Sequence, residues 1–500
     1  MKKNQQHKSS YLPDIKSKQR TQPVGWISLF LFLCFLIIAG PAFADEDDGS
    51  FSFVAEDAAW NDQEQDIDAD SGGFDDAAGF SISESEFSGD SGASRLEWEG
   101  DVGAIIRAYA DYDAPAGGTV SAYPTVGLNL TYTGDNSEAA AELRFNRNWN
   151  YDTPSLQQDL APQNISWYLQ RMIEKAYLRL FYDNFDLQVG YFKEVWGTGD
   201  QSHVVDPLNP FDYYDFVNND YIDRKVSEFM CKVDVPLGLM GLLELVYVPV
   251  FTPDSSPLTG KWMPKSLQDI SDALQAVPPA ELVRPDTRTL SDGQYAARLS
   301  WTLGGLDIAG TYYYGFVRAP YVEITASGPL PADFDKISLS YDRLHIFGLD
   351  AAVVLAGFNL RGEAAYYMGE DFEGSDDLRE NNHSIQYVAG FDRNLPLGNL
   401  NLNVQTIGAY FINESEDPTR NIVSAALTDS WNNDRIRPEV SASYGVEDED
   451  WMIRPNLNFT LVDDMTLEIE YAIFFGDEAG RFGQFDENDY LEIRFSHSFF

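Results

Sequence analysis

Few side chains in this sequence are of the types that act as nucleophiles, bases or soft metal ligands. Beyond residue 44 the histidines are His203, His345, His383 and His497. The same part of the chain holds one cysteine, Cys231, so it cannot form an internal disulfide. No G-x-S-x-G, H-E-x-x-H or Cys–His pattern surrounds these residues, and the pairing of His345 with nearby Asp342 is unspecific. We therefore expect no enzyme, no metal centre and no cofactor.

The segment from residue 196 to 215 is the strongest candidate for binding chemistry. Its polar candidates are Asp200, Asp206, Asn209, Asp212 and Asp215, and its structural candidates are Trp196, Gly197 and Pro210. Proline fixes φ, while Asp and Asn bond nearby backbone amides, which together predict a stiff loop. Two interpretations stay open. The loop folds into a lumen and presents its carboxylates to a solute, or it is a structural latch on a rim.

Two further features of this segment lead to expectations about single residues. His203 lies between Asp200 and Asp206 and could ligate a metal, although a solvent-exposed loop histidine is the simpler expectation. The Trp196-Gly197 pair is expected to end a strand at an outer rim, because an indole is stable between lipid and water.

Charge and composition limit the classes of partner. The 500 residues include 34 Lys+Arg and 80 Asp+Glu, a formal net charge of −46. Such a charge repels a polyanion at long range, so nucleic acid is not expected as a partner. Apolar residues make up 44% and aromatic residues 14%, which excludes a chain that is disordered throughout. No segment beyond residue 44 is long and apolar enough to predict a membrane-spanning helix.

The first 94 residues divide into two parts. Residues 1–44 contain a basic region, an apolar run from residue 26 to 40 and the sequence Ala42-Phe43-Ala44, which predicts a secretory signal peptide; an uncleaved anchor is the alternative. Residues 45–94 contain 16 acids and no Lys or Arg, which predicts a disordered acidic tail. Within the tail, residues 66–77 match a calcium loop only in part.

From Arg95 onward, apolar and polar residues alternate with the period of a β-strand. The segments that show this alternation are 95–112, 122–133, 138–149, 172–182, 186–196, 223–235, 241–251, 295–303, 306–316, 343–355, 359–368, 384–393, 399–411, 437–446, 452–461, 466–475 and 490–500. Short turns join them in pairs. The predicted long connections are 197–222, 252–292, 317–340, 369–383 and 412–436, and the only good helix candidate is 266–276.

This alternation of short and long connections is typical of a transmembrane antiparallel β-barrel, here residues 95–500. The pattern yields 17 strands, whereas single-chain barrels have an even number. We therefore predict about 16 strands, with a range of 14–18 and the miscounted strand near residues 437–490. A secreted β-sandwich or propeller is the soluble alternative.

Charged residues on the polar faces of these strands are the predicted lumen lining. They are Arg107, Arg144, Arg147, Arg179, Arg298, Arg361, Glu142, Glu174 and Glu363. Mixed charges in a lumen order water and select among polar solutes. The excess of acid predicts a channel that favours cations or neutral solutes and is not anion-selective.

Two stretches of sequence resemble known barrels. The chain ends on a strand in which Leu491, Ile493, Phe495 and Phe499 alternate before a terminal phenylalanine. Residues 174–216 resemble a hairpin and loop of large, poorly characterised Gram-negative outer-membrane barrels of the porin-like and alginate-export-like kind. The residues that match are Glu174, Ala176, Tyr177, Leu178, Gly190, Trp196, Gly197, Asp200, Asp206, Asn209, Pro210 and Asp212.

This resemblance implies a location in the outer membrane, reached by export across the inner membrane. It implies outer-membrane lipid and small hydrophilic solutes as partners, and it leaves the oligomeric state open. We expect a porin-like channel for passive passage. The alternatives are a plugged or surface-exposed barrel that acts as an adhesin, structural protein or ligand-binding protein, and an uptake channel for hydrophobic substrates.

Overall fold

The structure is a computed structural model that describes residues 95–110, 120–145, 170–213, 221–257, 260–268, 271, 281–282, 293–319, 321–326, 334–369, 383–412 and 418–499. The predicted signal peptide, the acidic tail with its calcium-loop pattern, Arg147 and Asp215 lie outside these ranges.

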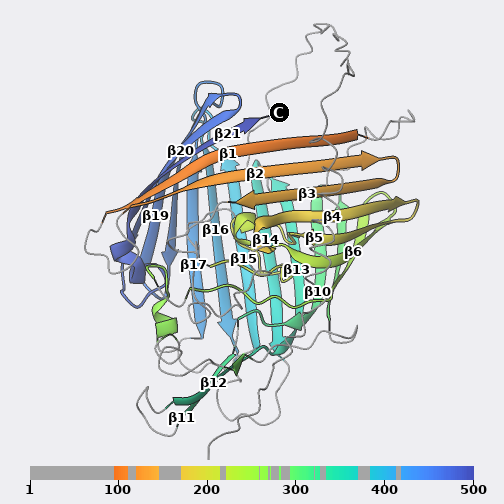
Figure 1. The fold of residues 1–500 in the computed structure, drawn as a ribbon, viewed down its shortest axis with the longest axis horizontal. Coiled ribbons are helices and arrows are strands. Elements are labelled where there is room, and N and C mark those ends of the chain that lie inside the picture. The colour runs from red at the N-terminus through yellow and green to blue at the C-terminus, as the bar shows by residue number, and fades with distance from the viewer. Residues whose placement is uncertain are drawn as a thin grey trace, which may run out of the picture. The chain divides into compact units, whose positions relative to one another are not determined.

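Eighteen strands form one antiparallel sheet (Figure 1). They are β1 (Arg95–Tyr109), β2 (Val120–Gly134), β3 (Ser137–Phe145), β4 (Ile173–Tyr182), β5 (Phe185–Phe192), β6 (Glu228–Leu237), β7 (Gly241–Val248), β9 (Gln294–Leu303), β10 (Leu306–Phe316), β13 (Arg343–Leu355), β14 (Phe358–Gly369), β15 (His383–Asn394), β16 (Asn401–Phe411), β17 (Thr419–Thr428), β18 (Ile436–Gly445), β19 (Asp450–Val462), β20 (Met465–Phe475) and β21 (Tyr490–Phe499).

The sheet closes on itself because β1 pairs with β2 on one side and with β21 on the other. The closing register runs from Gly100 opposite Phe499 to Tyr109 opposite Tyr490. No strand of this sheet is therefore left with an open edge, and the first and last strands begin and end at the same end of the barrel. The fold class is the predicted transmembrane-type antiparallel barrel, but it has 18 strands and not about 16.

The strand that the sequence analysis missed is β17, Thr419–Thr428, and not a strand within residues 437–490. It lies inside the predicted long connection 412–436. Its outward positions carry Asn421 and Ala425 beside Val423 and Leu427, so the apolar alternation is weak. The strand is specified instead by its two paired neighbours, β16 and β18.

One other predicted strand differs. Residues 223–235 were predicted as strand, but Tyr221–Arg224 form a short helix, α3, and β6 begins at Glu228. At the helix candidate 266–276, the structure describes a 3₁₀ turn, η2, at Lys265–Leu267, and helical conformation at Gln268 and Ser271. The other residues of this candidate lie outside the described ranges. A second 3₁₀ segment, η6, spans Gly483–Asn488. No helix among the described residues is long and apolar enough to cross a membrane.

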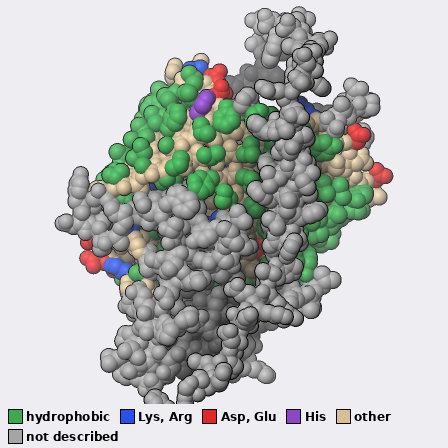
Figure 2. All heavy atoms as spheres, in the orientation of Figure 1, with side chains coloured by type: hydrophobic (Ala, Val, Ile, Leu, Met, Phe, Trp, Pro, Cys, Tyr) green, Lys and Arg blue, Asp and Glu red, His purple; other side chains and the backbone are tan. Residues whose placement is uncertain are grey.

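The barrel is apolar outside and polar inside. On β1 the side chains of Leu96, Trp98, Val102 and Ile106 are exposed on the outer face, while Arg107, the residue after Ile106, points inward and is 7% exposed. Figure 2 shows hydrophobic side chains across much of the visible described surface, with charged side chains gathered toward its ends. This is the inverse of a water-soluble protein, and it is the arrangement that lipid around a barrel requires.

The two ends of the barrel differ in the length of their connections. At one end strands are joined by turns of a few residues, such as Gly304-Gly305, where both residues have positive φ. At the other end the connections include 193–227, 249–293 and 317–342. A small separate sheet of β8 (Glu281–Leu282), β11 (Tyr321–Ala326) and β12 (Phe334–Ser340) belongs to these long connections.

The outward face yields a stability prediction. Leu349, in the middle of β13, is 64% exposed on the outer face. Leu349→Arg should lower the free energy of unfolding in bilayers by about 2–4 kcal/mol, because a lipid-facing cation is costly near the membrane centre. Asn458→Arg on the inner face of β19 is the matched control and should change it little. Equal effects in urea titrations of the two variants in lipid vesicles would contradict the assigned faces.

Candidate functional site

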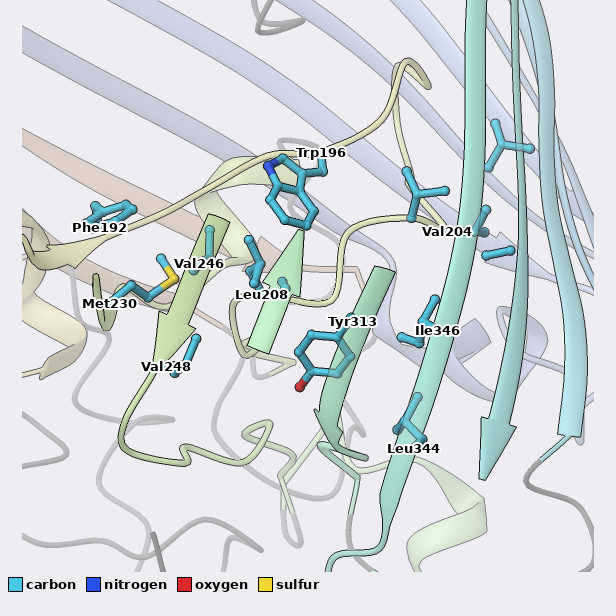
Figure 3. Close-up of a cluster of buried hydrophobic side chains, with 14 residues drawn as sticks. Phe192, Trp196, Val204, Leu208, Met230, Val246, Val248, Tyr313, Leu344 and Ile346 are labelled. Atoms are coloured by element: carbon cyan, nitrogen blue, oxygen red, sulfur yellow. The ribbon is translucent and has the colours of Figure 1, made fainter. Parts of the chain in front are cut away.

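The connection between β5 and β6, residues 193–227, turns into the barrel and packs on its inner wall. Val204, Val205 and Leu208 are at most 1% exposed. Val205 lies directly against Gly348 of β13, where a Cβ atom would approach Val205 Cγ1 to 2.7 Å. Figure 3 shows Val204 and Leu208 among side chains of the wall strands, including Ile346. The loop is thus part of the barrel interior.

Trp196 anchors the start of this loop. Strand β5 ends at Phe192, four residues earlier than predicted, and the chain then turns inward. Trp196 is 2% exposed within the cluster of Figure 3, so it does not lie at the lipid–water rim as predicted. The next residue, Gly197, has φ +117°, and a Cβ atom there would meet Glu363 Oε1 at 2.3 Å. Only glycine fits this close approach.

The carboxylate of Glu363, on β14, holds the loop to the wall. Its Oε1 accepts hydrogen bonds from the backbone amides of Thr198 and Gly199, both at 2.7 Å, and its Oε2 accepts one from Val204 N at 2.8 Å. The Nδ1 atom of His203 lies 2.8 Å from Oε1. His203 is therefore buried against Glu363, and it is neither the exposed loop histidine nor the partner of Asp200 and Asp206 that the sequence suggested.

Asp200 is fixed by three residues of the wall. Its carboxylate forms an ion pair with Arg361 of β14 and accepts a hydrogen bond from Asn403 Nδ2 at 2.8 Å. Its backbone amide donates to Gln405 Oε1 at 2.9 Å. Because Arg361 lies on β14 and Asn403 and Gln405 lie on β16, Asp200 joins the loop to two strands of the wall.

Asp206 is 5% exposed and pairs with Lys225 inside the loop. Tyr221 donates a hydrogen bond from its hydroxyl to Asp206 Oδ2 at 3.1 Å. Burial lowers the pKa of Lys225, against the opposing effect of Asp206, and burial together with Asp206 raises the pKa of Tyr221. Asp212 likewise forms an ion pair, with Arg171. Asp200, Asp206 and Asp212 are therefore each paired.

Asn209 and Pro210 join the two ends of the loop. Asn209 Oδ1 accepts from Glu194 N at 2.8 Å, and its Nδ2 donates to the carbonyl oxygens of Phe192 and Val226 at 3.0 and 3.1 Å. The carbonyl of Pro210 accepts from Val226 N at 2.8 Å. These hydrogen bonds hold the two ends of the loop together, next to the end of β5 and the start of β6.

A row of ion pairs runs around the inner wall from β4 to β13. Arg179 Nη2 lies 2.9 Å from Asp186 and 3.7 Å from Asp234. Lys232 contacts Glu194, Asp234 and Glu244 at 2.9, 3.5 and 2.8 Å. Arg298 completes the row with two hydrogen bonds to Asp350, at 2.7 and 2.9 Å.

Arg179, Arg298, Arg361 and Glu363, which were predicted to line the lumen, each lie on the inner face. Six members of the same network were not predicted: Asp186, Glu194, Lys232, Asp234, Glu244 and Asp350. The signal was available for the five on strands, because each alternates with apolar residues on both sides. Glu194 carries no such signal, because it follows the end of β5.

A cavity of about 500 Å³ lies between this loop and the inner wall of β1–β4 and β21. The charged side chains that line it are Glu99, Asp101, Arg107, Glu142, Arg144, Arg171, Glu174, Lys193, Asp212, Asp223, Arg224, Lys225 and Arg494. The predicted lumen residues Arg107, Arg144 and Glu174 therefore share one cavity with Asp212, whereas Arg179, Asp200 and Asp206 lie in the loop and wall network.

Within the cavity, opposite charges lie side by side. Arg107 Nε lies 2.6 Å from Glu492, and its guanidinium stacks on Tyr490 at 4.2 Å. Arg144 donates to Glu142 Oε1 at 3.1 Å, and Glu174 pairs with Lys193. Such a lining favours a hydrated polar solute over an apolar one.

A second connection, between β7 and β9, crosses the mouth of the barrel. We call its described part, residues 249–257 and 260–268, the strap. Trp262 of the strap is 4% exposed in a cluster with Tyr109, Phe474, Phe485 and Tyr490, at ring-centroid distances of 6.3, 5.7, 5.4 and 6.1 Å. These residues belong to β1, β20, η6 and β21, which lie across the closed ring of strands from β7 and β9.

Polar contacts fasten both ends of the strap. At the far end Asn488 Nδ2 donates to the carbonyl of Lys261 at 2.6 Å. At the near end Asp254 Oδ1 accepts from Phe211 N at 2.7 Å, which ties the strap to the first loop. Arg318, from the β10–β13 connection, donates to Thr252 O at 2.6 Å and to Glu228 at 2.7 Å. The strap is thus attached at both ends, to η6 on one side of the barrel and to the two neighbouring long connections on the other.

A closed antiparallel barrel with an even number of strands, an apolar outer face, short turns at one end and long loops at the other has the architecture of the porin-like outer-membrane barrels of Gram-negative bacteria. No protein-family model and no curated protein matches the chain.

Among solved structures, the chain is similar to Acinetobacter baumannii OccAB4, with 12% identity, 81% of this chain and 97% of that chain covered, and a TM-score of 0.45. It is also similar to a BenF-like porin from Pseudomonas fluorescens, with 10% identity, coverage of 81% and 98%, and a TM-score of 0.44. For Salmonella typhi OmpF the identity is 9%, the coverage 81% and 97%, and the TM-score 0.37.

The Glu363 contacts lead to a prediction about the inward loop. Glu363→Gln removes the negative charge of the group that accepts hydrogen bonds from three backbone amides. Hydrogen bonds to a charged group contribute about 1.5–3 kcal/mol each. Amide hydrogen exchange at Thr198, Gly199 and Val204 should accelerate by at least about tenfold, while exchange in β14 itself stays slow. Unchanged exchange at all three amides would refute the role of Glu363 as anchor.

Burial raises the pKa of Asp254 to about 6, although the hydrogen bond from Phe211 N opposes the shift. The folded state thus binds more protons than the unfolded state between about pH 4 and pH 6, so the stability of this junction falls as pH rises through that range. Amide exchange at Phe211, corrected for its intrinsic pH dependence, should quicken from pH 4 to 7. Asp254→Asn should remove this dependence, and persistence of the dependence in that variant would contradict the assignment.

Proposed function

We propose that this protein is an outer-membrane channel for passive passage of small hydrophilic solutes. The observation that carries the proposal is the 500 Å³ cavity on the inner wall, lined by charged side chains of both signs. A barrel that served only as a scaffold would not need a hydrated, charged interior, whereas opposing charges across a lumen orient polar solutes as they pass.

The two inward connections define the size of solute in this proposal. The first loop occupies the inner wall at β13–β16 through Glu363 and Asp200, and the strap crosses the mouth to Trp262. In this proposal solutes pass beside β1–β4, where the cavity of about 500 Å³ lies. The proposal is therefore a channel for small molecules on the scale of the cavity, not for polymers.

We further propose that the channel favours cations and neutral solutes over anions. Glu99, Asp101 and Asp223 line the cavity and form no ion pair with other described residues. Arg144 lies in the field of Glu174, Asp223 and Asp101 in addition to its partner Glu142. The lining holds seven basic and six acidic side chains, but Arg107, Lys225 and Arg494 are paired with Glu492, Asp206 and Glu468 outside the lining. The six acids then face four basic side chains, which supports a local surplus of negative charge.

Single-channel recording tests the selectivity. In a potassium chloride gradient across a planar bilayer, the reversal potential should show preference for potassium. The double variant Asp101→Asn/Asp223→Asn should reduce the potassium-to-chloride permeability ratio by about twofold or more, since selectivity depends on charged rings at the constriction. Asp307→Asn, near the β9–β10 turn, is the control and should leave the ratio unchanged. A wild-type channel that prefers chloride would contradict the proposal.

A plugged barrel that binds a ligand or an envelope partner is the second candidate, and the strap supports it, because both of its ends are fastened. An uptake channel for hydrophobic substrates has less support, because the cavity lining is charged.

Trp262→Ala separates the channel from the plugged barrel. The change removes the aromatic anchor from its cluster, and truncation of a buried Trp costs about 3–5 kcal/mol, so the strap should detach at that end. For a channel, wild-type protein already admits small sugars in a liposome-swelling assay, and the variant admits larger ones. No swelling with folded wild-type protein, together with swelling with the variant, would identify a plugged barrel instead. Leu239→Ala, at the exposed β6–β7 turn, is the control.

A further inference from the structure

The outward face of the barrel carries a separate chemical feature. Alternation along the strands assigns each side chain to the inner or outer face, and outside the bulge at the start of β4 the described outward positions hold no carboxylate. The charged or imidazole side chains at those positions are Arg343, His345, His383, Arg393 and His497. The chain has a net charge of −46, yet none of the few charged or imidazole side chains at these outward positions is an acid. The acids are therefore excluded from this face.

Three of these five residues form one patch at the loop end of the barrel, which we call the rim patch: Arg343, His345 and His383. The register places His345 opposite Met368 and Met368 opposite His383, so the two histidines lie at one level on β13 and β15. Arg343 is two residues closer to the mouth on β13. With strands about 4.8 Å apart, the imidazoles are separated by roughly 10 Å.

Aromatic side chains hold the rim patch in place. The guanidinium of Arg343 stacks over Tyr314 and Phe316, with 4.9 and 4.3 Å to the ring centroids. His345 stacks on Tyr314 at 4.7 Å, and its Nδ1 lies 3.0 Å from the hydroxyl of Tyr312. These contacts arrange the basic groups among tyrosine hydroxyls at the level where aromatic belts meet the lipid headgroups.

His383 has the same kind of support on the neighbouring strand. Its Nδ1 lies 3.3 Å from the hydroxyl of Tyr366, and the two rings stack at 6.4 Å. The pairing of an imidazole with a tyrosine hydroxyl thus occurs twice in one sector of the rim.

We propose that the rim patch binds the phosphate group of an anionic membrane lipid in the leaflet at the loop end. The patch faces lipid rather than the lumen, and the planar guanidinium of arginine recognises phosphate through paired hydrogen bonds. The surrounding apolar positions, such as Phe347 and Ile385, are exposed where acyl chains would lie. This site is independent of the channel, because none of its residues lines the lumen.

Native mass spectrometry of the purified barrel in neutral detergent tests the proposal, with dioleoyl phosphatidic acid as probe and dioleoyl phosphatidylcholine as comparison. Wild-type protein should retain phosphatidic acid preferentially. Arg343→Gln/His345→Gln/His383→Gln should weaken that retention by about tenfold, which corresponds to about 1.4 kcal/mol. Arg393→Gln/His497→Gln, with the same residue types at the turn end, is the matched control and should retain the lipid as wild type does.

Several outcomes would overturn the proposal. They are equal retention of the two lipids by wild-type protein, retention by the triple variant equal to wild type, and an equal loss in the control variant. Complete displacement of the lipid by millimolar inorganic phosphate would assign the patch to a soluble anion rather than a lipid. Arg343→Lys keeps the positive charge but lacks the planar guanidinium group, so this variant should retain less phosphatidic acid than wild-type protein. It therefore provides a second measurement if the triple variant fails to fold.

Discussion

The structure depends on one constraint, the hydrogen bonding of the backbone in an environment without water. A strand edge in lipid would leave its amide and carbonyl groups unpaired, and each such group costs several kcal/mol. Pairing of β1 with β21 removes the last edge, and it brings together residues almost 400 positions apart in the chain. Closure then fixes which side chains face lipid and which face the interior, because adjacent residues of a strand point to opposite faces.

The polar interior explains how two long connections can fold inward. The inner wall carries charged groups that bind a loop through hydrogen bonds and ion pairs. Glu363 accepts hydrogen bonds from three backbone amides of the loop, and Arg361 forms an ion pair with Asp200. Burying such charges is costly unless they are paired and hydrogen-bonded. The network therefore favours one arrangement of the loop, and around its fixed points Val204, Val205 and Leu208 form an apolar core inside the barrel.

The inner and outer faces of the barrel thus carry different sets of charged side chains. The interior holds closely spaced opposite charges, whereas the described lipid-facing strand positions hold none near the centre of the barrel wall. The loop-end rim of that outer face carries the basic and imidazole groups of the rim patch. The proposed passage beside β1–β4 and the proposed lipid contact on β13–β15 use the inner and the outer face of the barrel, respectively. This separation allows the proposed channel and the proposed lipid site to be altered independently.

The sequence by itself determined the fold class and the faces of most strands, because the two-residue alternation of a barrel strand is local. On that basis Arg107, Arg179, Arg298 and Glu363 could be placed inside. It did not determine β17, whose weak alternation is resolved only by its paired neighbours. Nor did it place Trp196 and Trp262, which a local reading assigns to a rim or to a loop. Closure of the ring sets β7 and β9 opposite β20, β21 and β1 and so places Trp262. The inward turn of the loop 193–227 places Trp196 against the inner wall. Contacts across a lumen have no local sequence period, so only the tertiary structure could decide them.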